Sequence, residues 1–378
     1  MAEDTLPLEF DEPGFAPVPA GAGHYVAAVQ NKPGELEALR RASPDTWCKL
    51  TPLIEIVGPR KPPVAYRWET IRGWLRRVGE AIGQRPCFLD VLRLDPGHPA
   101  VTPAGQRTVL ATIHAAARKA RLAFVPILPV GIRRDPTYAS VVRGAVAADG
   151  RGAALRYPLL RVALPPGKSH TSVLAAALLG VGLDVSCADI LVDLGYLSGN
   201  EDIDASDLIA ALEEVVAVGE WRSVVLLGTS MPPMLGGVVA EATIGELPRR
   251  EWNLWSALRR SQSGRLPTFG DYVIQHPDPP HGDDPGGPSM RANIRYTVNS
   301  TTLVARARGA VILEGREQYR GLCQQLVERP EFCGQAFSWG DEQIAACARS
   351  EIEPGSQNQW RGAGSSHHLR LVTEQLNR

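Results

Sequence analysis

The sequence predicts an α/β fold, a (β/α)8 TIM-like barrel with a C-terminal elaboration of a β-hairpin and helices. Seven apolar runs are each followed by a stretch with helical spacing, and these units recur about every 30 to 37 residues. The runs show little alternation with polar residues, as expected for strands of a parallel sheet buried on both faces. An eighth run follows, and eight units favour closure into a barrel.

An open, doubly wound parallel sheet is the alternative fold for strands that alternate with helices. The glycine-rich phosphate-binding turn typical of that fold, Gly-x-Gly-x-x-Gly, does not follow the first apolar run. The barrel is therefore favoured.

The predicted strands are short apolar runs bounded by glycine, proline or polar residues. In chain order they are His24–Gln30, Leu50–Val57, Cys87–Arg93, Ala123–Pro129, Tyr157–Leu164, Asp189–Leu194, Ser223–Gly228 and Asp271–Gln275. The predicted helices between them carry one apolar face. They are Gly34–Arg41, Trp68–Ile82, Pro103–Lys119, Pro136–Ala148, Ser169–Leu179, Ala205–Val218 and Leu247–Arg260.

The regular alternation stops after residue 276, and a different pattern follows. Arg291–Val298 and Thr301–Ala307 flank Asn299-Ser300, which predicts a β-hairpin. Three helices are expected after it, at Gln318–Glu328, Asp341–Arg349 and His367–Leu376. Either the first or the last of these could serve as the eighth helix of the barrel.

Four parts are expected along the chain. Residues 1–22 form a flexible acidic leader, and residues 23–276 form the barrel. Residues 277–350 form the elaboration, beginning with a mobile loop, 277–290, that is rich in Pro, Asp and Gly. Residues 351–378 form a terminal loop and helix that pack on the barrel.

The composition points to a soluble cytoplasmic protein. The 40 basic and 41 acidic residues leave a net charge of −1, which gives no overall attraction to nucleic acid or anionic lipid. No run approaches the roughly 20 apolar residues that cross a bilayer. The acidic start of the chain does not resemble a secretory signal. The six cysteines are scattered and contain no Cys-x-x-Cys, so free thiols are expected.

Ionisable residues within or after the predicted strands indicate a site at the carboxyl ends, where barrel enzymes carry their chemistry. We expect Glu55, Asp90 and Asp193 to converge there with Arg161. Such carboxylates could hold Mg²⁺ with substrate phosphates, the one cofactor that the pattern suggests, or act as an acid and a base. The structural alternative is that these charges only pair with one another inside the barrel.

His276 is the best single candidate for a general base, because it is expected to end the eighth strand beside a proline-rich loop. A histidine that only hydrogen-bonds within a loop is the alternative. Other polar residues near the strand ends are expected to bind a phosphorylated or nucleotide-like ligand; these are Lys32, Arg93, Arg161, Thr229, Ser230 and, from the hairpin, Arg295.

Aromatic residues and arginines gather in the last third of the chain and could stack on a base or a single strand. The alternative is that the rings pack the elaboration against the barrel, with the arginines at its surface. A metal site is not expected at His367-His368, since adjacent histidines point to different sides of a helix.

Five strings together resemble the "beta protein" family found in phage, prophage and bacterial genomes. They are Thr51–Ile56, Pro267–Pro277, Gln318–Leu326, Phe337–Asp341 and His367-His368. The resemblance runs from Tyr25 to the carboxyl terminus, and only the loop at 277–290 looks like a local insertion. It implies an association with mobile elements or phage–host conflict and supplies no catalytic residues.

Two functions follow from these expectations. The first is an enzyme that binds a small phosphorylated or nucleotide-like ligand at the rim and hydrolyses or eliminates it. The alternative is a non-catalytic binding or sensor component of a phage-related or antiphage assembly, with a protein partner.

Overall fold

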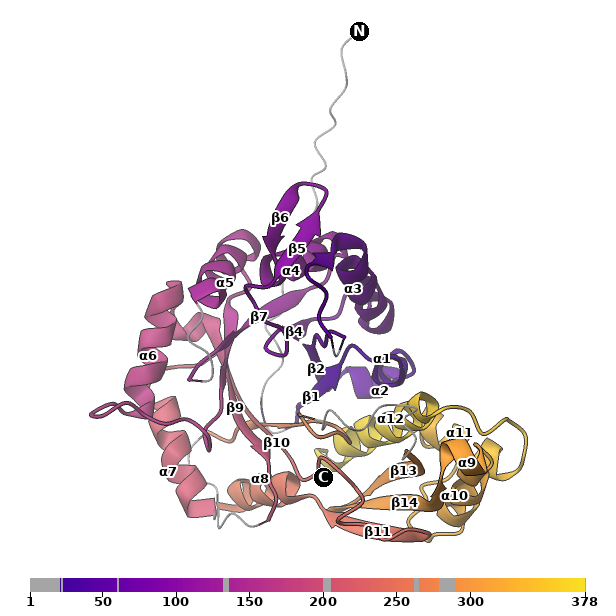
Figure 1. Cartoon of the computed structure of the whole chain (residues 1–378). Coiled ribbons are helices and arrows are strands. Elements are labelled where there is room, and N and C mark those ends of the chain that lie inside the picture. Colours follow the sequence, from indigo (N-terminus) through magenta and orange to yellow (C-terminus); the bar gives the residue numbers. More distant parts are fainter. Residues whose placement is uncertain are drawn as a thin grey trace.

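The computed structural model describes residues 21, 23–59, 61–131, 136–199, 205–261, 265–278 and 290–377, and it contains the predicted closed barrel (Figure 1). Eight parallel strands close the ring in chain order, so that the eighth pairs with the first. They are β1 (Tyr25–Gln30), β2 (Leu50–Glu55), β4 (Cys87–Asp90), β7 (Phe124–Pro129), β8 (Ala153–Tyr157), β9 (Ala188–Tyr196), β10 (Ser223–Thr229) and β12 (Thr268–Asp271).

Alternation along the strands fills the interior of the barrel with apolar side chains. Val26, Leu53, Phe88, Ala154 and Leu191 belong to one buried cluster inside the ring. Because side chains of a strand alternate between its two faces, the residues two positions further along also point inward. Those positions lie one layer closer to the carboxyl ends of the strands.

In the described part of the chain, eight helices surround the barrel and cover its outer face (Figure 1). They are α1 (Pro33–Arg40), α3 (Trp68–Ile82), α4 (Val109–Lys119), α5 (Pro136–Asp149), α6 (His170–Val181), α7 (Ala205–Val216), α8 (Arg250–Ser261) and α12 (Gln357–Gln375). The terminal helix α12 packs against α1 and is therefore the eighth helix of the barrel. It begins at Gln357 rather than at the predicted His367. The earlier start was not predicted because Gly and Ser have low helix propensity, which the packing of Gly362 against Gly34 of α1 overrides here.

Two of the predicted strands are misplaced. The fifth is Ala153–Tyr157 rather than Tyr157–Leu164, and the eighth is Thr268–Asp271 rather than Asp271–Gln275. In both cases the apolar run continues past the strand into a buried turn. Leu159 and Ile274 are buried although the strand has ended, and Val273 has a φ of 57°, outside the range of a strand. Burial of a turn thus produced the apolar pattern of a strand.

A second, antiparallel sheet lies beside the barrel, in the order β11 (Thr243–Pro248), β14 (Thr301–Ala310), β13 (Arg291–Val298). The hairpin of β13 and β14 is the predicted one. We call this sheet, together with α9 (Val311–Glu314), α10 (Gln318–Val327) and α11 (Trp339–Ala348), the C-terminal unit. Strand β11 belongs to the connection between β10 and α8, where helix had been predicted from Leu247.

A small sheet of β3 (Tyr66–Arg67), β5 (Pro99–Thr102) and β6 (Gly105–Thr108) occupies the connections after β2 and β4. It explains why α4 begins at Val109 and not at the predicted Pro103. A short helix, α2 (Pro44–Trp47), precedes β2. No helix among the described residues combines the length and the apolar character needed to span a membrane. Most of the predicted leader and of the loop at 277–290 lies outside the described residues.

Glycines bring α12 into close contact with both the barrel and the C-terminal unit. A Cβ on Gly34 of α1 would lie 2.2 Å from the carbonyl oxygen of Asn358. A Cβ on Gly340 of α11 would lie 1.9 Å from the carbonyl oxygen of Ala363. These are backbone atoms, so the helices would have to separate to admit even one methyl group.

We expect Gly34→Ala to destabilise the protein by about 1–3 kcal/mol, the usual cost of overpacking a tight contact. The matched control is Gly73→Ala in α3, where an added Cβ would meet no atom within 4 Å. That change should be neutral or stabilising by up to about 1 kcal/mol, since alanine favours helix over glycine. Urea unfolding of the wild type and the two variants measures these changes in the free energy of unfolding. Equal stabilities of Gly34→Ala and Gly73→Ala would contradict the close contact between α1 and α12.

Candidate functional site

One buried arginine lies at the centre of the carboxyl ends of the strands. Arg156 of β8 is 3% exposed, and its guanidinium contacts carboxylates from three other strands. Nη1 donates to Oε1 of Glu55 at 2.8 Å and also to Asp90, and Nε donates to Oδ2 of Asp193 at 3.0 Å. All four residues occupy the inward layer directly above the apolar interior, which is why the closed barrel brings them together.

The carboxylates are fixed by further donors. The hydroxyl of Tyr272, which follows β12, lies 2.8 Å from both oxygens of Asp193 and accepts a bond from Nη2 of Arg156. The amides of Leu92 and Gly195 donate to Asp90 and Asp193 at 2.6 and 2.8 Å. The cluster is thus a closed network in which each carboxylate accepts at least two hydrogen bonds.

The environment separates the acidities of Glu55 and Asp90. Burial opposes ionisation of Glu55, but the guanidinium groups of Arg93 and Arg156 outweigh it and hold the Glu55 pKa below its ordinary value. Burial raises the pKa of Asp90, since the attraction of Arg156 compensates it only in part and nearby Glu55 adds negative charge. Two neighbouring carboxyl groups with pKa values shifted in opposite directions are suited to act as base and acid.

A cavity of about 540 Å³ opens above this network. Glu55, Arg156, Asp193 and Tyr272 are among the residues that line it, and all four are almost fully buried. Three side chains that are less buried also line the cavity. They are Arg93, Arg161 and Asp278, which are 18%, 51% and 68% exposed.

Two arginines at the cavity differ in their partners. Arg93 donates to Glu55 at 3.0 Å and to Asp278 at 2.7 Å. Because Glu55 ends β2 and Asp278 follows β12, Arg93 links the segments at these two strand ends. Arg161 lies 3.7 Å from Asp193, and its guanidinium rests on Gly195. A Cβ on Gly195 would lie 2.9 Å from Nη2 of Arg161, so the glycine makes room for this side chain.

The structure brings together Glu55, Asp90 and Asp193, with Arg93 and Arg161 beside them. Arg161 is not in the fifth strand, however, because β8 ends at Tyr157. The strand contributes Arg156 instead, which the sequence analysis missed. Its signal was a single charge in the short run Ala153–Tyr157, which was not predicted as a strand.

His276 does not end the eighth strand, which stops at Asp271. Its ring packs edge-on against Tyr196 with centroids 5.0 Å apart, and its Nδ1 accepts a bond from the amide of Asp278 at 2.8 Å. Burial lowers its pKa. His276 is not among the residues that line the cavity, so its observed contacts are those of a loop histidine.

The hydroxyls of Thr229, which ends β10, and of Ser230, which follows it, bind the backbone around them. Thr229 donates to the carbonyl of Gln275 at 3.3 Å and accepts from the amide of Met231. Ser230 accepts from the amide of Arg250 and donates to Glu251 at 2.6 Å. Burial raises the pKa of Glu251 to about 7.

Arg295 and Lys32 lie next to the site rather than in its cavity lining. Arg295 of β13 donates to the carbonyl of Ile274 and to Gln275 at 3.2 Å, which ties the C-terminal unit to the segment after β12. Lys32 precedes α1, and burial lowers its pKa although Glu35 lies nearby.

Within the described ranges, no group of three or more His, Cys, Asp or Glu side chains is arranged to hold a metal ion. At the strand ends, the guanidinium of Arg156 occupies the position between the carboxylates. His367 and His368 contact different aspartates, Asp341 at 2.9 Å and Asp271 at 2.8 Å, so they do not face a common ion.

The aromatic residues of the last third mostly pack the interior. Trp255, Trp360, Tyr272, Tyr296 and Tyr319 are almost fully buried. Tyr319 stacks on Trp360 and Tyr296 stacks on His367, so these rings pack the C-terminal unit against α12 as the packing interpretation expects, whereas Trp255 and Tyr272 belong to the barrel itself.

We expect Arg156→Met to destabilise the protein by about 3–5 kcal/mol at neutral pH, because it leaves carboxylates buried without a counter-charge. Without the guanidinium, burial raises their folded pKa above the unfolded values, so the folded variant binds more protons than the unfolded chain. Its stability should therefore fall as pH rises. In the wild type, the lowered pKa of Glu55 contributes stability that is lost on acidification.

The loss of unfolding free energy in Arg156→Met relative to the wild type should thus become smaller as the pH is lowered from about 8 to about 5. Denaturant unfolding of both proteins at the two pH values measures it. Arg161→Met is the control, since its half-exposed side chain should contribute no more than about 0.5 kcal/mol. If the difference in unfolding free energy does not change with pH, the ionisation of the buried carboxylates does not depend on Arg156.

Comparison with known proteins supplies a family for the chain. No protein in the curated set matches it. The model of the Beta protein family matches residues 25–374, which is nearly all of the described structure. The chain therefore belongs to the Beta protein family.

Proposed function

We propose that the cavity at the carboxyl ends of the strands binds a small phosphorylated or nucleotide-like ligand. The observation that carries this proposal is the position of Arg161. Its guanidinium is half exposed, lines the cavity and rests on Gly195, and within the described chain its ion pair with Asp193 is long, at 3.7 Å. Such a group is held in place and still has donors to offer to an anion.

The surroundings of Arg161 support an anionic ligand of limited size. Arg93 and Arg156 line the same cavity, so three guanidinium groups face it. The volume of about 540 Å³ falls within the range of roughly 300–1,000 Å³ that is usual for small-molecule sites. Tyr272 and Asp278, which also line it, follow β12, and phosphate sites of such barrels are often built by the loops after the seventh and eighth strands.

A catalytic role is a second candidate, favoured by the opposite pKa shifts of Glu55 and Asp90. Glu55, which lines the cavity, would serve as a base in hydrolysis or elimination. Asp90 does not line the cavity and would act as an acid only after Arg156 has moved. Both are now engaged by Arg156. A phosphate that takes over donors of Arg93 or Arg156 would release a carboxylate oxygen for proton transfer, and Mg²⁺ could enter only with such a rearrangement.

The alternative function needs no catalysis. In it, the protein is a binding or sensor component of a phage-related or antiphage assembly, and the same cavity binds the ligand without turnover. The phage setting itself rests on the family resemblance. Site residues and binding chemistry are the same for both functions, so ligand capture is the first property to test.

Small molecules released by denaturing the purified protein should include a phosphorylated compound, identified by mass spectrometry. In Arg161→Met we expect its yield to fall about tenfold or more, since one hydrogen-bonded charge pair contributes about 1.5–3 kcal/mol. Arg76→Met is the matched control, because Arg76 is exposed on α3 and pairs with Glu80 far from the cavity. Equal yields from the wild type and Arg161→Met would refute the assignment of the anion to Arg161.

A further inference from the structure

An exposed carboxylate occupies one arginine of the cavity at the carboxyl ends of the strands, which we call the strand-end cavity. Asp278 follows β12, and its Oδ1 accepts a hydrogen bond from Nη1 of Arg93 at 2.7 Å. Both residues line the cavity. Among the described residues, Oδ2 of Asp278 has no hydrogen-bond partner. Asp278 therefore holds a guanidinium that an anionic ligand would otherwise meet.

Arg93 is kept in place independently of Asp278. Its Nε donates to the buried carboxylate of Glu55 at 3.0 Å. Of its two terminal nitrogens, Nη1 binds Asp278, and Nη2 has no partner among the described residues. If Asp278 moved away, Glu55 would still orient the guanidinium, and both terminal nitrogens would be free. Two such donors bind the oxygens of a phosphate group side by side.

A permanent ion pair of the same chain has a different geometry. Arg222 donates through Nε and Nη2 to both oxygens of Asp189, at 3.0 and 2.5 Å, and Asp189 is fully buried. Arg93 and Asp278 share a single hydrogen bond, and Asp278 is in contact with solvent. Exposed ion pairs contribute little to stability. The pair of Arg93 and Asp278 can therefore be exchanged for another anion at small cost.

The backbone of Asp278 is held separately from its side chain. Its amide donates to Nδ1 of His276 at 2.8 Å, and the ring of His276 packs edge-on against Tyr196. Pro277, which lies between them, has a fixed φ and also lines the cavity. Rotation of the Asp278 side chain alone would thus release Arg93, and the segment itself does not have to move.

Asp278 is ionised at neutral pH. Partial burial opposes its ionisation, but the charge and the hydrogen bond of Arg93 outweigh this effect, with smaller contributions from His276 and Arg161. The pKa of Asp278 therefore lies below its ordinary value. The side chain that occupies Arg93 is thus an anion, like the ligand that the cavity is proposed to bind.

We propose that Asp278 is an internal competitor of the ligand: it occupies Arg93 in the free protein, and an anionic group of a phosphorylated ligand displaces it. This inference rests on the proposed function, since it concerns the same cavity. Displacement lowers the affinity of every anion that uses Arg93 by the same factor. Weakly held anions are therefore kept out, and only a ligand with further contacts in the cavity fills it.

Calorimetric titration of the full chain with inorganic phosphate, at constant ionic strength, tests the proposal. Asp278→Asn should bind phosphate about threefold to tenfold more tightly than the wild type, because it removes the competing anion and keeps the size of the side chain. Asp45→Asn is the matched control. It also removes one charge from an exposed aspartate that pairs with an arginine, Arg370, but it lies before β2, at the opposite end of the barrel. Its affinity should stay within about twofold of the wild type.

A second pair of variants shows whether Asp278 acts through Arg93. In the Arg93→Gln background, Asp278→Asn should change the affinity by less than about twofold, because the contested donor is gone. Arg93→Gln is expected to fold, since Arg156 still pairs with Glu55.

The possible failures are distinguishable. Equal affinities of the wild type and Asp278→Asn, or an undiminished gain in the Arg93→Gln background, would overturn the competitor and leave phosphate binding in the cavity intact. If neither the wild type nor Asp278→Asn binds phosphate, the proposed function fails together with this inference.

Discussion

The contact on which the functional end of the barrel depends is that of one guanidinium with three carboxylates. Glu55, Asp90 and Asp193 are each at most 2% exposed, and ions buried to this degree are costly unless they are paired and hydrogen-bonded. Arg156 meets all three because its planar fork offers donors in several directions. The layer of charge above the apolar interior is stable only as a whole, and any ligand in the cavity has to compete with these internal bonds.

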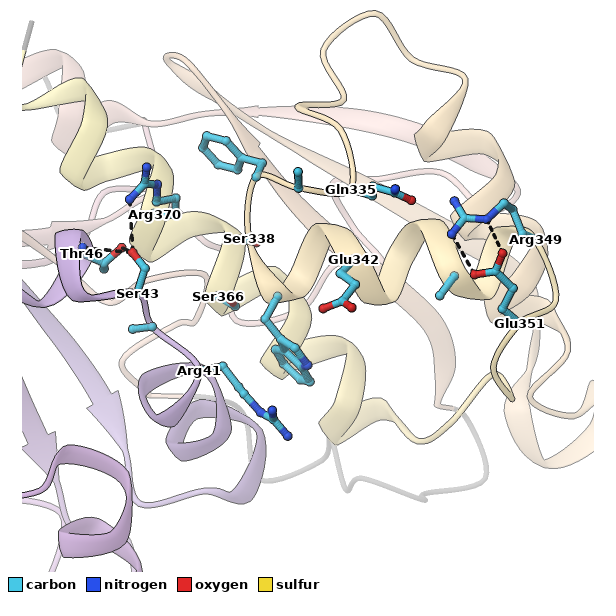
Figure 2. A pocket seen from close by; sticks show the side chains of 15 residues that line it. Arg41, Ser43, Thr46, Gln335, Ser338, Glu342, Arg349, Glu351, Ser366 and Arg370 are labelled. Atoms are coloured by element: carbon cyan, nitrogen blue, oxygen red, sulfur yellow. Dashed lines mark hydrogen bonds and ion pairs between the residues drawn. The ribbon is translucent and has the colours of Figure 1, made fainter.

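The C-terminal unit and the terminal helix α12 hold the segment that completes the site. Arg295 binds the carbonyl of Ile274, and His368 of α12 binds Asp271 at the end of β12. Tyr272 and Asp278 belong to this segment, so their positions at the cavity depend on contacts outside the ring of strands. The C-terminal unit, which is built from the chain segments after β10 and β12, therefore helps to hold one wall of the strand-end cavity. Residues at the start of α11 also line a larger cavity, of about 710 Å³, together with α12 and the segment that leads into β2 (Figure 2).

Much of the architecture could be predicted because it is encoded locally. Apolar runs at regular intervals predicted six of the eight strands in place, and α3 has the bounds that its helical periodicity indicated. The two misplaced strands were predicted where apolar residues are buried without being in a strand. Leu159 and Ile274 are examples, since both are buried in turns. Glu55, Asp90 and Asp193 were found because a charge in an apolar run is conspicuous. Arg156 was missed because its strand is short and rich in alanine.

The sequence by itself determined the parallel barrel and the end of it at which charges gather, since strand burial and side-chain alternation are properties of consecutive residues. Only the tertiary structure decided the partners of those charges. Whether Glu55 meets a metal ion, a histidine or an arginine depends on the register around the ring, which joins residues 101 positions apart. The same holds for the larger cavity, whose walls come from opposite ends of the chain and meet only when α12 packs on α1.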